Sequence, residues 1–130
     1  MAKAEGFTLP FVGPEKVKAT FLETFPYEGP VQTIRYKTAE FSAVCPFSGL
    51  PDIADVEIEY VPAAKIVELK SLKYYFMSYR DVGIYQEHVN AKIFEDLKTV
   101  LQPRELVVRM KYNTRGGIDA FTEVSLSKNR

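Results

Sequence analysis

The stretch EFSAVCPFSGLPD, residues 40–52, contains the only cysteine of the 130-residue chain, Cys45, and ends on an acid, Asp52. A thiol can act as a nucleophile when its surroundings favour the thiolate, and a carboxylic acid can transfer a proton. Cysteine is also a common small apolar residue of protein interiors, and an aspartate after a proline is a common turn residue. The two residues alone therefore leave a chemical role and a purely structural role open.

Two further stretches carry polar side chains that could bind a ligand. ELKSLKYY, residues 68–75, places Lys70 and Lys73 three positions apart, and YQEHVN holds Glu87 and the only histidine, His88. Lysines at this spacing are usual on a solvated helix face, and the helix dipole favours a glutamate near a helix start, so each feature has an ordinary explanation. Taken jointly, a thiol, an acid and two lysines are what a cysteine-dependent reductase with an anionic cofactor requires.

The composition limits the partners and the compartment. Seventeen Lys and Arg residues balance 17 Asp and Glu residues, so no overall field draws the chain to nucleic acid or to a membrane surface, and a small-molecule or protein partner is expected. The first ten residues lack the apolar core of a secretory signal, and no apolar run is long enough to cross a bilayer. One cysteine cannot form an internal disulfide, so we expect the cytoplasm, where the thiol stays reduced.

Several common signatures are missing from the chain. It has neither a G-x-G-x-x-G stretch nor a P-loop, which disfavours a Rossmann dehydrogenase and a nucleotidase. One histidine and one cysteine cannot build a zinc cage without carboxylate help, so no metal site is expected.

The periodicity of apolar residues predicts the elements that must position these side chains. Prolines and glycines crowd residues 1–30, which we predict to be an N-terminal arm with one short helix over residues 15–22. Alternation of apolar and polar residues predicts strands over 31–44 and 53–62, with Asp52 in the loop between them. Helical spacing predicts one helix with Leu69, Leu72, Phe76 and Tyr79 on its buried stripe and an end at Gly83, and a second with Tyr85, Val89, Ile93, Leu97 and Val100, ending before Pro103.

The last part of the chain predicts a strand pair, residues 105–113 and 118–127, around the turn TRGG. The order strand, strand, helix, helix, strand, strand is that of a single α+β domain over residues 1–130. We therefore predict a four-stranded antiparallel sheet covered on one face by two helices.

The stretches EFSAVCPFSGLPDIADVEIEYVP and ELKSLKYYFMSYRDVGIYQEHVN resemble the 7-cyano-7-deazaguanine reductases, NADPH-dependent nitrile reductases of queuosine biosynthesis, in their short single-domain form. The similarity runs from Glu40 to the RGGI turn at residues 115–118, which is most of the chain. It rests on two blocks: Cys45 with Pro46 and the following Pro51-Asp52, and ELKSLKYY, which matches the family's cofactor motif. The resemblance implies the tunnelling fold, in which such units join by their sheet edges into a barrel around a tunnel, here as a decamer of two stacked pentamers.

The resemblance also implies roles for individual residues. Cys45 is the nucleophile that adds to the nitrile of 7-cyano-7-deazaguanine to form a thioimide, and Asp52 supplies the proton. Glu87 grips the edge of the base, and Glu68 orients the substrate or the lysines. The residues implied for the NADPH cofactor are Lys70, Ser71 and Lys73, with Arg115 of the TRGG turn as a further phosphate contact.

One departure from the family concerns the residue before Glu87. Some members place a histidine there, whereas this chain has Gln86 and its only histidine, His88, follows the glutamate. Either Gln86 or His88 takes a modified role at the substrate, or Asp52 carries the proton transfer alone; His88 can equally be an exposed helix residue.

Two other functions stay open at this point. A related archaeosine-forming amidinotransferase uses the same thioimide but accepts ammonia on a base already in tRNA; the intact ELKSLKYY and the balanced charge argue against it. A non-catalytic ring protein of the same fold is the second, and the retained Cys45 and Asp52 argue against that.

Overall fold

Two long antiparallel strands form the centre of the structure, a computed structural model that describes residues 10–126. They are β2 (Ile34–Val44) and β3 (Pro51–Val61), and β5 (Glu105–Tyr112) and β6 (Phe121–Leu126) extend them into one antiparallel sheet in the order β2-β3-β5-β6. Buried and exposed side chains alternate along β3, because successive residues of a strand point to opposite faces of the sheet. This alternation is the sequence pattern that predicted the strand.

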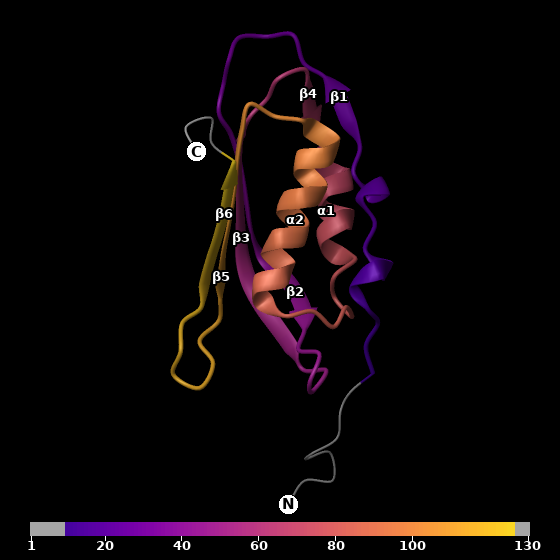
Figure 1. The fold of residues 1–130 in the computed structure, drawn as a ribbon, viewed down its shortest axis with the longest axis vertical. Helices are drawn as coiled ribbons and strands as arrows, with labels where there is room; N and C mark the ends of the chain where they lie inside the picture. The colour runs from indigo at the N-terminus through magenta and orange to yellow at the C-terminus, as the bar shows by residue number, and fades with distance from the viewer. Residues whose placement is uncertain (1–9, 127–130) are drawn as a thin grey trace, which may run out of the picture.

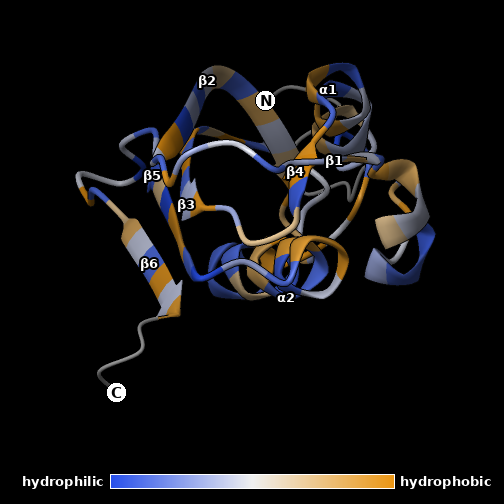
Figure 2. Ribbon diagram, turned by 90° about the horizontal axis from the view of Figure 1, so that it is seen from above, coloured by the Kyte–Doolittle hydropathy of each residue, from blue (hydrophilic) through white to orange (hydrophobic). Residues whose placement is uncertain are grey.

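Two helices, α1 (Leu69–Met77) and α2 (Gln86–Leu101), cover one face of this sheet (Figure 1). Seen from above, their apolar sides turn toward the strands (Figure 2). Helix α2 ends at Leu101, and its C-cap Gln102 has a left-handed backbone (φ 46°) directly before Pro103. The α+β class is confirmed. Within residues 10–126 no helix is long and apolar enough to span a membrane.

The predicted faces of the helices need correction. Leu69, placed on the buried stripe of α1, is 57% exposed, whereas Ser71, Leu72 and Tyr75 are buried. The helix is turned this way because the Ser71 hydroxyl accepts a hydrogen bond from the backbone N–H of Glu23 at 2.9 Å, which fixes that side against the N-terminal segment. Helix α1 also ends at Met77, well before Gly83.

In α2 the N-cap residue Tyr85 is exposed rather than buried. Asn90, Phe94 and Leu101 are buried together with the predicted Val89, Ile93 and Leu97. The Asn90 amide donates to the carbonyl of Val108 at 3.1 Å and to the Thr122 hydroxyl at 2.8 Å, so this polar residue ties the helix to β5 and β6.

The N-terminal arm differs from the predicted single helix. It has two short 3-10 helices, Pro14–Lys16 and Ala19–Phe21, because the prolines and glycines interrupt longer elements. A three-residue strand, β1 (Thr24–Pro26), then pairs antiparallel with β4 (Lys65–Val67) in a second, small sheet that the sequence pattern did not reveal. Residues 1–9 of the predicted arm lie outside the described residues.

The segment before α2 is held between two distant parts of the chain. Gly83 donates its N–H to the carbonyl of Val12 at 2.7 Å, and Ile84 donates to the carbonyl of Val44 at 3.1 Å. A side chain at Gly83 would not fit, because a Cβ there would lie 2.6 Å from the ring of Phe11. These bonds place the start of α2 beside the end of β2, and hence beside Cys45.

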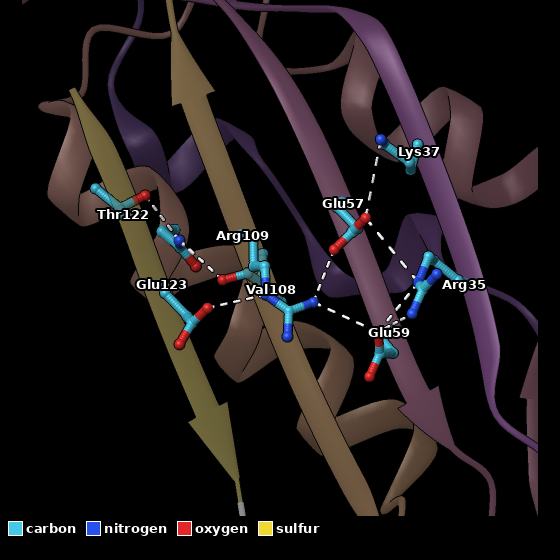
Figure 3. Close-up of polar contacts among 9 residues, drawn as sticks. Arg35, Lys37, Glu57, Glu59, Val108, Arg109, Thr122 and Glu123 are labelled. Carbon is cyan, nitrogen blue, oxygen red and sulfur yellow. Dashed lines mark hydrogen bonds and ion pairs between the residues drawn. The ribbon is translucent and has the colours of Figure 1, made fainter. Parts of the chain in front are cut away.

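The face of the sheet opposite the helices carries a ladder of alternating charges (Figure 3). Arg35 on β2 pairs with Glu59 on β3 at 2.7 Å. Arg109 on β5 contacts Glu57 at 2.7 Å and Glu123 on β6 at 2.9 Å. The side chains are direct cross-strand neighbours, so the ladder runs across all four strands and fixes their register on the open face.

Candidate active site

Cys45 lies in the tight hairpin between β2 and β3. Its N–H donates to the carbonyl of Leu50 at 2.9 Å, and its carbonyl accepts from the N–H of Gly49 at 2.7 Å. Gly49 has a φ of 75°, a left-handed conformation that favours glycine. The residues CPFSGL therefore fold back on themselves and hold the half-buried thiol in one place.

The same turn stabilises the thiolate. The backbone N–H of Phe47, then that of Ser48, and the Ser48 hydroxyl lower the pKa of Cys45 below its ordinary value, while burial and the charge of Asp52 oppose this. Successive N–H groups that converge on one atom form an anion-binding concavity. Because the thiolate is the reactive form of cysteine, this turn favours a nucleophilic Cys45 over an inert one.

Asp52 lies in β3 and not in the predicted loop, because the strand begins at Pro51, two residues before the predicted start at Ile53. It pairs with Ala43 of β2, and its side chain turns to the helix-covered face, where it is 8% exposed. Burial raises the pKa of Asp52, and the charge of Arg115 opposes the shift. Arg115 Nη1 lies 2.5 Å from Asp52 Oδ1. The carboxyl therefore holds its proton more readily than a free aspartate, as a general acid must.

Three elements surround a small cavity at Asp52. Its volume is about 120 Å³. Its wall includes Gln86 from the start of α2, Tyr112 from the end of β5 and Arg115 from the following turn. The β2–β3 hairpin, the start of α2 and the β5–β6 turn all lie at one end of the molecule (Figure 1). The structure thus brings together three residues predicted from sequence: Asp52, Gln86 and Arg115.

Glu87 and His88 lie beside this cavity in the exposed first turn of α2. The pKa of Tyr112 is raised by burial, then by the charge of Asp52 and then by that of Glu87. The Glu87 carboxylate is therefore close enough to influence a residue of the cavity wall. The His88 ring packs edge-on against the Tyr85 ring, with centroids 6.1 Å apart. His88 therefore occupies the position of an exposed helix histidine near the site.

The ELKSLKYY residues lie elsewhere, at the start of α1 toward the end of the molecule that carries β1 and β4 (Figure 1). Glu68 is the N-cap of α1: its carboxylate accepts from the N–H of Lys70 at 2.6 Å and of Ser71 at 2.8 Å. The Ser71 hydroxyl donates to the carbonyl of Glu68 at 2.7 Å. Glu68 and Ser71 thus build the helix start, and their bonds occupy N–H groups that could otherwise meet a phosphate.

Lys70 and Lys73 are both exposed but line different hollows. Lys70 Nζ lies 5.9 Å from the centroid of the Tyr74 ring, in a hollow that Glu23 and Glu68 also line. Lys73 lies in a groove of about 170 Å³ between α1 and β2. The groove combines an apolar floor with the charged residues Lys37, Glu40, Lys73 and Arg80.

Two features of the site were missed from sequence. The amides beneath the thiol could have been inferred from the CPFSG turn, because a glycine three residues after a proline marks a tight turn. Tyr112 could have been found from the alternation in the strand 105–113, because every second residue from Leu106 to Tyr112 points into the protein. Backbone amides leave no mark of their own in a sequence, and Tyr112 is one of eight tyrosines.

Comparison with known proteins decides the family. The sequence model of the family described as QueF-like protein matches residues 51–130. The chain belongs to the QueF-like family. Proteins named NADPH-dependent 7-cyano-7-deazaguanine reductase from Thermotoga petrophila and Thermotoga maritima are each 53% identical to it over 125 residues, which is 95% of this chain and 91% of theirs. A protein of the same name from Caldicellulosiruptor bescii is 50% identical over 108 residues, 82% of each chain.

A solved structure shows the same fold. The archaeosine synthase QueF-Like in its apo form superposes with a TM-score of 0.69 at 26% identity, covering 75% of this chain and 95% of that one. The resemblance inferred from the two sequence blocks is confirmed, and the α+β arrangement is that of a QueF-like protein.

Proposed function

We propose that this QueF-like protein reduces the nitrile of 7-cyano-7-deazaguanine to the primary amine, 7-aminomethyl-7-deazaguanine, with NADPH, in queuosine biosynthesis. The observation that carries the proposal is that one hairpin holds Cys45, a thiol with a lowered pKa, and Asp52, a buried acid with a raised pKa whose charge acts on that thiol. Relatives that share half of the sequence carry this activity in their names. Because the thiol must stay free, we expect the enzyme to work in a reducing compartment, the cytoplasm.

Cys45 begins the reaction by adding to the nitrile carbon. A sulfur–carbon bond forms, one π bond of the nitrile moves its electrons to nitrogen, and the nitrogen takes the proton of Asp52, which gives a thioimide. NADPH, when bound, would supply hydride, and reduction from nitrile to amine would use two NADPH molecules and two protons; Asp52 gives the first proton, and after reprotonation from water it can give the second. Cys45 leaves the carbon as a thiolate between the two reductions, and its turn amides receive the charge again.

The first turn of α2 is the proposed substrate contact. Glu87 is exposed beside the Asp52 cavity, where its carboxylate can accept two N–H bonds from the edge of the base. Gln86 lines the cavity and supplies an amide that both donates and accepts, and His88 follows two residues later in the exposed first turn of α2. Glu68 acts indirectly in this proposal, because as the N-cap it holds the helix that carries the lysines.

The chain offers a fitting surface for NADPH. The backbone N–H groups at the helix start are occupied by Glu68, so the side chains of Lys70 and Lys73 are the proposed phosphate contacts there, with Ser71 as support beneath them. Arg115, which lies beside Asp52 at the other end of the molecule, is the proposed third phosphate contact. The groove at Lys73 sets three cations against one carboxylate over apolar side chains. Such a groove suits a ligand with anionic phosphates and flat rings.

A second copy of the chain is needed to unite these parts. The cofactor residues of α1 and the Cys45 hairpin lie toward different ends of one chain (Figure 1). Within the described residues, β6 pairs with no strand along its outer edge, and β2 is bonded on its outer side at Val44, to Val82 and Ile84, but to no further strand. We propose that these edges join between copies in a tunnelling-fold barrel, as a decamer of two pentamers, with the site between subunits and the charged face of Figure 3 turned to the tunnel.

Light scattering tests the assembly. The mass in solution should be many times the 14.8 kDa of one chain, with a multiple of five expected. If the site spans two subunits, mixing Cys45→Ala with Lys73→Ala should restore activity at low NADPH after subunits exchange, because some sites then contain both native residues. A stable and active monomer would exclude the barrel and the shared site.

Lysine variants test the cofactor site. Replacing Lys70 or Lys73 by Ala should raise the KM for NADPH by roughly ten- to a hundredfold, because charge-assisted contacts contribute about 1.5–3 kcal/mol. The effect should shrink at high salt, and thioimide formation should stay intact, since it involves no cofactor. Lys98→Ala, at an exposed position of α2, is the matched control.

The same assay separates the reductase from the alternatives. The amidinotransferase is not favoured, because the reductase-named relatives are twice as similar in sequence as the archaeosine synthase. A wild type that consumes no NADPH but transfers ammonia to a nitrile base would restore it, and lysine variants that behave like the wild type would refute the cofactor site. A small-molecule substrate, and neither tRNA nor a membrane, is the expected partner.

A further inference from the structure

Tyr112 is a buried residue at the site to which the sequence assigns no role. It is the last residue of β5, pairs with Ala54 of β3 and is 1% exposed. Its side chain forms part of the wall of the cavity that Asp52, Gln86 and Arg115 also line. Its hydroxyl has no hydrogen-bond partner among residues 10–126.

The other buried tyrosines of the core have partners for their hydroxyls. Tyr60 accepts from the N–H of Val67 at 3.1 Å, and Tyr75 bonds both Tyr79, at 3.0 Å, and Asp96, at 2.5 Å. An unpaired buried hydroxyl lowers stability, and phenylalanine would fill the same space without that cost. The oxygen of Tyr112 is therefore unfavourable for the fold alone, which indicates that its partner arrives with a ligand.

The surroundings of Tyr112 make its hydroxyl a donor. Burial, and after it the negative charges of Asp52 and Glu87, raise the pKa of Tyr112 above its ordinary value, so the hydroxyl keeps its proton. Arg115 is engaged with the Asp52 carboxylate, and Gln86 does not titrate. Tyr112 is thus a neutral, fixed donor in the cavity of the proposed acid.

We infer that Tyr112 is a further catalytic residue, whose hydroxyl donates a hydrogen bond to the substrate nitrogen next to Asp52 while Cys45 adds to the nitrile carbon. This inference rests on the proposed function. The nitrogen gains electron density as the sulfur–carbon bond forms, and a donor fixed in a dry site stabilises that charge. Asp52 transfers the proton, whereas Tyr112 keeps its own.

Tyr112→Phe removes this donor and nothing else. The rate of thioimide formation, measured with 7-cyano-7-deazaguanine and no NADPH, should fall roughly ten- to a thousandfold. The melting temperature should stay the same or rise, because the variant loses an unpaired oxygen. Binding of 7-deazaguanine, which lacks the nitrile, should not change.

Tyr60→Phe is the matched control. It removes the same atom from a tyrosine buried on the same face of the sheet, but it leaves the N–H of Val67 without its partner. Its melting temperature should fall while the rate of thioimide formation stays that of the wild type. A loss of stability in Tyr112→Phe equal to that of Tyr60→Phe would indicate a structural role and overturn the inference.

The outcomes separate this inference from the proposed function. If the wild type forms the adduct and Tyr112→Phe forms it equally fast, Tyr112 is not catalytic, while the nitrile reductase remains. If the wild type forms no adduct, the proposed function is refuted, and the role of Tyr112 that rests on it is refuted too. Weaker binding of 7-deazaguanine by the variant would place the hydroxyl at the ring and overturn its assignment to the nitrogen. Tyr112→Leu repeats the test should the phenylalanine variant not fold.

Discussion

Cys45→Ala is expected to abolish the oxidation of NADPH by 7-cyano-7-deazaguanine, with a loss of more than about a thousandfold in kcat, because alanine offers no nucleophile to the nitrile carbon. The fold should be unchanged: the hairpin is held by the backbone bonds of Cys45 to Leu50 and Gly49, which alanine retains. The assay is the continuous absorbance of NADPH, with circular dichroism as the check on folding.

Two variants of the same hairpin serve as controls for Cys45→Ala. Ser42→Ala lies on β2 three residues before the thiol and should retain activity. Ser48→Ala removes one of the hydrogen bonds that lower the pKa of Cys45, so its activity should require a higher pH than that of the wild type. Turnover that survives Cys45→Ala would exclude the covalent route.

Asp52→Asn is expected to slow turnover by about 10²- to 10⁴-fold while substrate binding persists, because an amide cannot deliver a proton. Asn can still accept the hydrogen bond of Arg115, so the local geometry should survive. Asp55→Asn, on the exposed side of the same strand, is the control that should leave kcat unchanged. Unchanged turnover in Asp52→Asn would assign the proton to another group.

The pH dependence of the reaction follows from the two shifted pKa values. The reactive thiolate of Cys45 grows with pH up to its lowered pKa, and the protonated form of Asp52 declines with pH above its raised pKa, so activity, which needs both forms, should pass through a maximum. The contribution of Asp52 to the free energy of unfolding also decreases with pH. Because its pKa is higher in the folded than in the unfolded chain, this contribution is present in acid and is lost as pH rises through the folded pKa. Asp52→Asn should therefore remove the alkaline limb of the activity profile and be at least as stable as the wild type at neutral pH.

The sequence predicted the parts of the fold that depend on strong local patterns. Alternation in 31–44 and 53–62 gave the two long strands, and Pro103 ended α2. The strands β1 and β4 were not predicted, because three residues are too few to show an alternation of apolar and polar side chains. Their pairing also joins segments about 40 positions apart. Leu72 is buried as predicted, but the exposure of Leu69 was not predicted, because the contact of Ser71 with Glu23 joins residues 48 positions apart and leaves no local pattern.

The sequence predicted the part of the candidate site that lies in one hairpin, but not the contacts between distant elements. Cys45 and Asp52 belong to one hairpin, so their spacing alone indicated that they lie close together. The contact of Asp52 with Arg115 and the shared wall of Gln86 and Tyr112 join three elements that are distant in sequence. Such contacts depend on how the hairpins and α2 pack at one end of the sheet, which no local pattern specifies.

The most direct test of the proposed chemistry is the mass of the intact protein after incubation with 7-cyano-7-deazaguanine in the absence of NADPH. Addition of a thiol to a nitrile expels no group, so the wild type should gain the mass of the whole substrate, on the peptide that contains Cys45. Cys45→Ala should gain nothing. An unchanged wild-type mass, or a gain that persists in Cys45→Ala, would contradict a thioimide at Cys45.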